Sequence, residues 1–337
     1  MIASTPVARW YWGVRGRPTD LVSEAVHRFA LAIRVLDRHR LGTPHNGQVA
    51  VSIPEPGNRS HLLKADLRVG ALAEDGSGAA DALVSHIEKR LAPGEIGTVN
   101  LYAPCDGIVD TDNGGQPTEK MFTLSVEVSQ DFFNVTLTTF SDAWLPLDLR
   151  GRAQESVFAV NAPRLAAALA EISEALDLEI DPDDPTRLAV PTESGIENHF
   201  RDDAGTPWDV WGSFEIPYRN GIFNQTPRFT AGYKRTTSGP VRYVPVIGIT
   251  GVLGYLWVSD TDGAASFEPS ETADLDGYRA GLVWLDRLQK AYDRGLSPTA
   301  ALTELTALPG DPEAGHATPG GLTDVDELRK LQELAQS

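Results

Sequence analysis

The sequence predicts an α+β fold, made mainly of antiparallel sheets with flanking helices and divided into two subdomains. Three observations support this prediction. The 337 residues suffice for two domains at roughly 150 residues each. Apolar residues make up 41% of the chain and charged residues 23%, as in an ordinary globular protein. The expected strands alternate apolar with polar residues and follow one another closely, which is typical of antiparallel sheets.

The N-terminal part begins with an aromatic strand followed by an amphipathic helix. The strand is expected at 8–14, and a helix then opens at Pro18, with Thr19 or Asp20 as its N-cap. This helix has one apolar face, formed by Val22, Val26, Phe29, Ile33 and Leu36. Further elements are expected as strands at 48–53, 97–103, 120–128 and 133–140, and as helices at 79–91 and from Asn161-Ala-Pro163 onward.

The C-terminal part begins with segments rich in aromatic residues, which favour strands. Strands are expected at 208–218, 228–234, 241–247 and 252–259. Within them, Pro245 predicts a sheet edge or a bulge, because proline cannot donate to a ladder. Helices are expected at 275–294, from Ser297-Pro298 onward, and after a capping-box pattern at Thr323-Asp-Val-Asp326.

Changes in composition divide the chain into four segments. Residues 1–180 are expected to form an N-terminal α+β domain, and the polar, proline-rich residues 181–207 a linker or long loop. Residues 208–308 are expected to form a second domain of sheet and helices. Residues 309–337, rich in glycine and proline at their start, are expected to be a linker and a C-terminal helix.

The formal net charge of −18 and the pI of about 4.7 bear on the class of partner. An acidic protein repels the phosphate backbone, so nucleic-acid binding is disfavoured, whereas a basic protein partner is attracted. The single cysteine, Cys105, excludes a disulfide within the chain. The N-terminal residues lack the pattern of a signal peptide, and no apolar stretch is long enough to span a membrane, so a cytoplasmic location is expected.

The usual catalytic signatures are not found in the sequence. It contains no His-Glu-x-x-His, Gly-x-Ser-x-Gly, Walker lysine loop or Gly-x-Gly-x-x-Gly pattern, and its histidines are not spaced as a metal-ligand pair. Two acidic stretches begin like calcium loops, at Asp110 and at Asp260. The first has Met121 at position twelve and the second has Ala265 at position six, so both depart from the calcium pattern. We therefore assign no catalytic residue, no metal ligand and no cofactor.

Two groups of residues are candidates for binding a partner. Trp208 and Trp211 are aromatic residues of the kind that dominate interface hot spots, although packing on the two faces of a strand would also account for them. The second group is expected in an exposed loop between the last strand and the long helix, because its carboxylates could not be buried without partners. Its members are Asp260, Asp262, Glu268 and Glu271.

The opening segment resembles a known group of proteins. Tyr11-Trp12-Gly13-Val14-Arg15, followed directly by a capped helix, is similar to the Tyr-Trp-Gly-x-Arg start of bacterial polymorphic-toxin immunity proteins. Residues 241–246 and 253–260 also look like actinobacterial proteins associated with secreted-toxin loci. The resemblance implies a small α+β protein that binds and neutralises a cognate toxin, without catalytic residues.

Two other classes of function remain open from the sequence. One is a hydrolase or transferase whose site is assembled only in three dimensions. The other is a secretion accessory protein or chaperone that holds an effector before export. A deep pocket with convergent carboxylates and histidines would favour the enzyme, and an exposed apolar groove would favour the chaperone. The oligomeric state cannot be read from the sequence.

Overall fold

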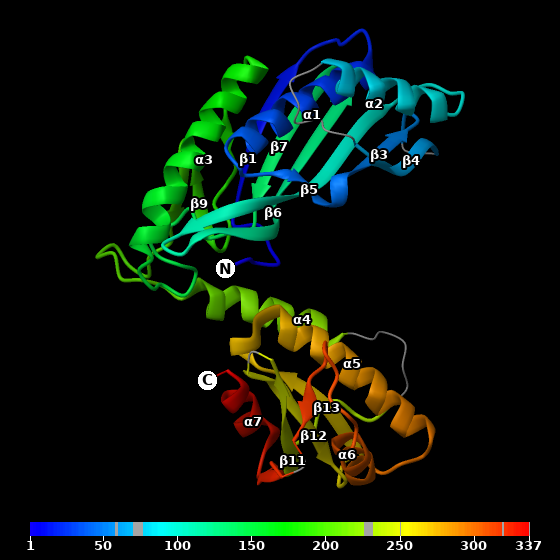
Figure 1. The fold of residues 1–337 in the computed structure, drawn as a ribbon, viewed down its shortest axis with the longest axis vertical. Coiled ribbons are helices and arrows are strands. Elements are labelled where there is room, and N and C mark those ends of the chain that lie inside the picture. Colours follow the sequence, from blue (N-terminus) through cyan, green and yellow to red (C-terminus); the bar gives the residue numbers. More distant parts are fainter. Residues whose placement is uncertain (58–59, 70–76, 226–231, 250, 319, 337) are drawn as a thin grey trace. The chain divides into compact units, whose positions relative to one another are not determined.

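The computed structural model describes residues 1–57, 60–69, 77–225, 232–249, 251–318 and 320–336 (Figure 1). They form two compact units, Met1–Glu215 and Ile216–Ser337, called unit 1 and unit 2 below. Each unit combines helices with sheets of antiparallel strands, which confirms the predicted α+β class. Within the described ranges, no helix has both the length and the apolar composition needed to cross a membrane.

Unit 1 is built on an eight-stranded antiparallel sheet. Its main path runs β4-β3-β5-β6-β7-β1-β8, and β2 pairs with β5 beside it. The strands are β1 (Ala8–Arg15), β2 (Thr43–Pro44), β3 (Gln48–Pro54), β4 (His61–Arg68), β5 (Thr98–Thr111), β6 (Gly114–Ser129), β7 (Phe132–Thr139) and β8 (Asp181–Pro182). A 3-10 turn, His45–Gly47, leads into β3.

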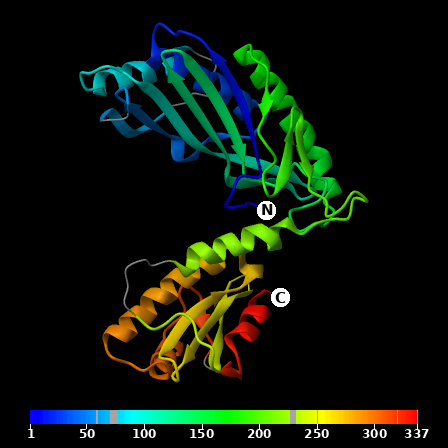
Figure 2. The same cartoon turned by 180° about the vertical axis from the view of Figure 1, so that it is seen from behind.

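Helices cover one face of this sheet. They are α1 (Leu21–Arg38), α2 (Ser77–Arg90) and α3 (Glu155–Leu176), and α1 packs on β5 and β6 with α2 and α3 as neighbours. Of the two predicted N-caps, Thr19 and Asp20, it is Asp20 that caps α1: its carboxylate accepts from the backbone N–H groups of Val22 and Ser23 at 3.1 Å. The opposite face carries mainly polar side chains, because buried and solvent-facing residues alternate along the strands. Figure 2 shows the ribbon from behind.

Asn161 does not cap the third helix, as the sequence had led us to expect. The helix begins six residues earlier, at Glu155, and Asn161 is fully buried inside it. Its side-chain amide donates to the carbonyl of Asp110 and to that of Val157, both at 2.7 Å. A buried asparagine must satisfy its amide, and here it does so by joining α3 to the β5–β6 hairpin rather than by capping.

The β5–β6 hairpin is longer than the sequence predicts. It extends to Thr111 and Gly114, so Asp110 and Asp112 lie at its tip. The carboxylate of Asp110 accepts from the guanidinium groups of Arg40 and Arg164, at 2.6 and 3.0 Å. This first calcium-like stretch is therefore a hairpin end held by two arginines.

Residues 181–207, expected as a linker or long loop, belong to unit 1. They contain β8, which pairs with β1, and the hairpin of β9 (Ala189–Thr192) and β10 (Gly195–Asn198). Both views show this hairpin between α3 and β1 (Figures 1 and 2). The division between the two units instead follows Glu215.

The strand predicted at 208–218 is wrong, because this segment is helical. A π-helical turn, Trp211–Glu215, is followed by α4 (Ile216–Asn224). Asp209 starts the turn: its carboxylate accepts from the N–H of Gly212 at 2.8 Å, and its carbonyl accepts from the Ser213 hydroxyl at 2.6 Å. These local hydrogen bonds outweigh the strand preference of the aromatic residues. The strand expected at 228–234 falls largely outside the described residues.

Unit 2 is a five-stranded antiparallel sheet with helices on both faces. The order is β13-β12-β11-β14, with β15 pairing to β11 beside β14. The strands are β11 (Val241–Gly248), β12 (Gly251–Ser259), β13 (Ala264–Pro269), β14 (His316–Ala317) and β15 (Thr323–Val325). Besides α4, the helices are α5 (Asp274–Asp293), preceded by a 3-10 turn at Glu271–Ala273, α6 (Pro298–Thr306) and α7 (Leu328–Ala335).

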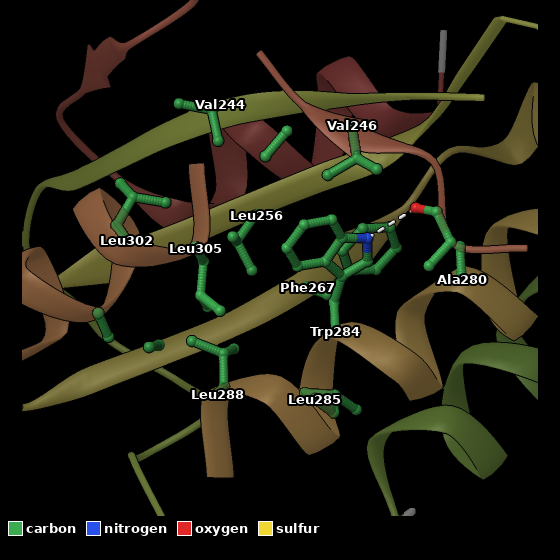
Figure 3. Packing of buried hydrophobic residues seen from close by; sticks show 14 of the residues in the cluster. Val244, Val246, Leu256, Phe267, Ala280, Trp284, Leu285, Leu288, Leu302 and Leu305 are labelled. Atoms are coloured by element: carbon green, nitrogen blue, oxygen red, sulfur yellow. Dashed lines mark hydrogen bonds between the residues drawn. The ribbon is translucent and has the colours of Figure 1, made fainter. Parts of the chain in front are cut away.

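The main core of unit 2 lies between the sheet and the helices α5 and α6 (Figure 3). Trp284 of α5 stands at its centre, 1% exposed, and its indole N–H donates to the carbonyl of Ala314 at 2.8 Å. Ser297 caps α6 and Pro298 occupies its first turn, as predicted. A smaller cluster on the other face joins Trp257 to Leu328 and Leu331 of α7.

The part of the chain expected as a linker, followed by a capping box at Thr323–Asp326, contributes two short strands to the sheet, β14 and β15. β14 and β15 pair with opposite ends of β11, and Pro245 lies in the gap between them. Since a gap demands no N–H from β11, proline is tolerated there, and its carbonyl accepts from Thr318 at 3.1 Å. The expected capping box does not form, because Thr323 is part of β15. The residue before α7 is instead Glu327, and its side chain makes no capping hydrogen bond.

Candidate binding surface

The four acidic residues expected in one exposed loop do not share a loop. Asp260 and Asp262 lie in the turn between β12 and β13, Glu268 lies on β13, and Glu271 opens the following 3-10 turn. The prediction was wrong because residues 264–267, Ala-Ala-Ser-Phe, form a buried edge strand that was too short to be recognised. The carboxylate of Asp260 accepts from the N–H of Thr299 at 2.9 Å, at the start of α6.

Of the four acidic residues, Glu268 differs most from the predicted exposed position, because its carboxyl group is largely buried. It alternates along β13 with Phe267 of the main core and so lies on the face that α7 covers. Burial raises the pKa of this carboxyl to about 7, against a smaller lowering by the side-chain hydrogen bond with Gln332 and by the charge of Arg235. Glu268 is therefore a buried residue that contacts α7 and is not part of an exposed loop.

The raised pKa of Glu268 predicts that unit 2 loses stability as the pH rises. The ordinary value is 4.5, so between this value and about 7 the folded state binds a proton that the unfolded state has lost. The free energy of unfolding should fall by about 3 kcal/mol across that window. Urea unfolding of wild type and Glu268→Gln at pH about 5 and about 8 checks it, because the variant should lack this decrease. Equal pH dependence in both proteins would contradict the assignment.

No metal or thiol chemistry is indicated in the part of the chain that the structure describes. In these residues no group of three or more His, Cys, Asp or Glu side chains is arranged to hold a metal ion. Cys105 is buried, and burial raises the pKa of its thiol to about 12. A protonated, buried thiol is a poor nucleophile.

The two tryptophans expected to anchor a partner have different environments. Trp208 is partly exposed and packs edge-on against Phe214 and His199, with ring centroids 5.4 and 6.4 Å away. Trp211 is 1% exposed and belongs to the interior of unit 1, where its backbone N–H donates to the carbonyl of Leu149 at 2.9 Å. Only Trp208 therefore remains accessible to a partner.

Most of the net negative charge of the chain lies in unit 1. This unit has 32 acidic and 18 basic residues, a formal charge of −14, whereas unit 2 carries −4. Residues 171–215 alone contain 13 acidic residues and two arginines. Ten of these carboxylates are exposed, and we call this set the acidic surface: Glu174, Asp177, Glu179, Asp181, Asp184, Glu193, Glu197, Asp202, Asp203 and Asp209.

The acidic surface is held to the sheet by side chains of β1. The indole N–H of Trp10 donates to the carbonyl of Thr192 in β9 at 2.8 Å. The Tyr11 hydroxyl and the Arg9 guanidinium both donate to the carboxylate of Asp183, each at 3.2 Å. The aromatic strand that opens the chain therefore positions the segment that carries the negative charge.

One part of the acidic surface is a tight loop at 201–206. Asp202 accepts from the N–H groups of Ala204 and Thr206 at 3.1 Å and from the Thr206 hydroxyl at 2.7 Å. The hydrogen bonds from Thr206 hold the pKa of this carboxyl below its ordinary value. Gly205 supplies the positive φ of +79° that the turn requires. The loop therefore presents Asp202 and Asp203 in a fixed geometry.

An aromatic group lies beside this loop in the chain. Phe200 is 47% exposed and bridges to Pro207 across the loop, next to His199 and Trp208. The His199 ring is fixed by its Nε2 contact with the carbonyl of Thr186 at 2.8 Å. Exposed aromatic rings next to a field of carboxylates are suited to binding a basic protein, because the rings supply area and the carboxylates supply attraction.

The acidic surface was not predicted, because residues 181–207 were expected to form a linker or long loop and the class of partner was inferred from the charge of the whole chain. The density of carboxylates in 171–209 is the signal that could have identified it.

No family model matches this chain, and no curated protein or solved structure matches it significantly. What the chain binds must therefore be inferred from the chemistry of its surface.

Proposed function

We propose that this protein is an immunity protein, which binds a basic protein toxin through the acidic surface of unit 1 and so neutralises it. The observation that carries the proposal is the gathering of ten exposed carboxylates on one segment, residues 171–215, beside the partly exposed Trp208. The Tyr-Trp-Gly-x-Arg strand supports it, because Trp10 and Tyr11 fasten this segment to the sheet.

The charge and the aromatic rings have different roles in such a complex. A dense negative field raises the rate of encounter with a positively charged partner and disfavours acidic competitors. Aromatic side chains contribute to the lifetime of the complex once water is excluded from them. Phe200 and Trp208 are the exposed and partly exposed rings next to the 201–206 loop. We therefore assign partner attraction to the carboxylates and partner retention to these two rings.

Neutralising part of the acidic surface should slow association with the toxin. The variant Asp184→Asn, Glu193→Gln, Glu197→Gln, Asp203→Asn removes four exposed charges and no hydrogen bond that fixes the fold. We expect the association rate at low salt to fall about tenfold, with little change in the dissociation rate. The difference should shrink at high salt, because screening weakens attraction between exposed charges. Stopped-flow mixing with the toxin captured from the native cell measures both rates.

A matched variant of unit 2 provides the control. It replaces Asp260, Asp262, Glu271 and Asp276 by their amides, so it removes the same charge and includes three residues first considered for partner binding. Its association rate should stay close to that of wild type. An equal slowing in both variants would show that net charge alone matters. If association slowed in the unit 2 variant alone, the toxin-binding residues would have to be assigned to the region around the turn between β12 and β13 instead.

A further inference from the structure

Strand β4 forms one edge of the unit 1 sheet and leaves part of its backbone without a partner. It pairs with β3 on one side, where the N–H of Val69 bonds to the carbonyl of Gly47. Because backbone groups alternate along a strand, the even-numbered residues of β4 direct their N–H and C=O groups away from β3. Leu62 uses its carbonyl to accept from Ala92 at 3.0 Å. Among the described residues, the outward backbone groups of Lys64 and Asp66 have no backbone partner.

The side chains of β4 are complementary to those of a second, antiparallel β4. Lys64 and Asp66 are both exposed on the open face of the sheet, while Leu63 and Leu67 are buried on the helix face. We propose that two copies of this chain associate through β4, with the two-fold axis passing through Ala65. Lys64 then lies opposite the partner's Asp66, and Leu63 lies opposite the partner's Leu67. The two sheets join into one through the ladder groups that β3 leaves unused.

The charges select this register over its neighbours. A shift of the axis to residue 64 would put each Lys64 opposite its own copy. A shift to residue 66 would put each Asp66 opposite its own copy and Lys64 opposite the partner's Arg68. Like charges directly opposite each other destabilise a strand pair, whereas opposite charges stabilise it. A register shifted by a single residue would pair even-numbered with odd-numbered positions, so the leucines of the two copies would lie on opposite faces of the joined sheet. Of the three registers compared, with the axis at residue 64, 65 or 66, only the pairing about Ala65 satisfies the backbone, the charges and the apolar side chains together.

A charge-swap experiment tests this dimer. Sedimentation velocity of wild type over a range of concentrations should show a monomer–dimer equilibrium. The variants Lys64→Asp and Asp66→Lys each put two pairs of like charges across the axis, so dimerisation should weaken about tenfold or more. The double variant Lys64→Asp, Asp66→Lys restores opposite charges and should dimerise like wild type. Both side chains are exposed, and circular dichroism verifies that each variant is folded.

A control variant separates this pairing from an effect of net charge. Glu127→Lys changes the charge as Asp66→Lys does, on an exposed residue of the interior strand β6, and should leave dimerisation unchanged. A wild type that stays monomeric at all concentrations would overturn the proposal. Single variants that dimerise as well as wild type, or a double variant that stays monomeric, would overturn it equally. Loss of toxin capture in Asp66→Lys, with a monomeric wild type, would assign β4 to the toxin instead.

Discussion

Replacing Trp12 by alanine is expected to lower the free energy of unfolding of unit 1 by about 3–5 kcal/mol. Trp12 is fully buried beneath the helices, and its indole N–H donates to the Ser173 hydroxyl of α3 at 2.8 Å. Alanine would leave a cavity between β1 and α3 and would also leave that hydroxyl with one contact fewer. Because β1 holds the acidic surface through Trp10 and Tyr11, the loss should also loosen residues 181–198.

Two companion variants separate the causes in Trp12→Ala. Ser173→Ala removes only the hydrogen bond and should cost about 1 kcal/mol. Val14→Ala, on the same strand but 40% exposed, should stay within about 0.5 kcal/mol of wild type. Urea unfolding followed by hydrogen exchange of unit 1 peptides measures all three. A Trp12 variant as stable as Val14→Ala would show that β1 does not support the core as described.

Replacing Trp284 by alanine should have an effect of similar size on unit 2, about 3–5 kcal/mol. The ring lies in the main core (Figure 3). The guanidinium of Arg287 stacks on it, 4.5 Å from the ring centroid, and the indole N–H donates to the carbonyl of Ala314. That hydrogen bond attaches residues 311–317 to α5. Peptides from 311–317 should therefore lose protection from hydrogen exchange more than those from the rest of unit 2.

The control for Trp284 lies on the same helix. Leu282 is 44% exposed, so Leu282→Ala should change the free energy of unfolding by no more than about 0.5 kcal/mol. Arg287 also donates to the carboxylate of Asp311 at 2.6 Å, which gives the 311–317 segment a second attachment. Uniform loss of protection throughout unit 2 in Trp284→Ala would mean that the segment does not depend on the indole.

Helices with local end signals could be predicted from the sequence. Asp20 and Ser297 are caps followed by an apolar stripe, so α1 and α6 were recognised with their start residues. The alternation of Phe122, Leu124, Val126 and Val128 likewise identified β6, because one face of that strand is buried and the other faces solvent. The expected α+β class followed from such segments, since each carries its signal within a few residues.

Features decided by contacts far apart in the chain could not be predicted in the same way. Asn161 looks like a cap, but its partner is the backbone of Asp110, 51 residues away. Residues 181–198 look like a linker because their strands are short, yet they are stabilised by Trp10 and Tyr11 of β1. Glu268 looks exposed in the sequence, but it is covered by α7, which follows it in the chain only after the helices α5 and α6. The density of carboxylates in 171–209 is visible in the sequence, whereas the attachment of that segment to unit 1 depends on these distant contacts.

The most direct test of the proposed function is rescue of a cell from the captured toxin. The protein that co-purifies with this chain from the native cell is expressed in a heterologous host, alone and together with this chain. The captured protein should be basic and should stop growth, and wild type should restore growth. The variant Asp184→Asn, Glu193→Gln, Glu197→Gln, Asp203→Asn should restore it less well than the matched unit 2 variant. A captured protein that does not stop growth, or growth that wild type fails to restore, would contradict the proposal.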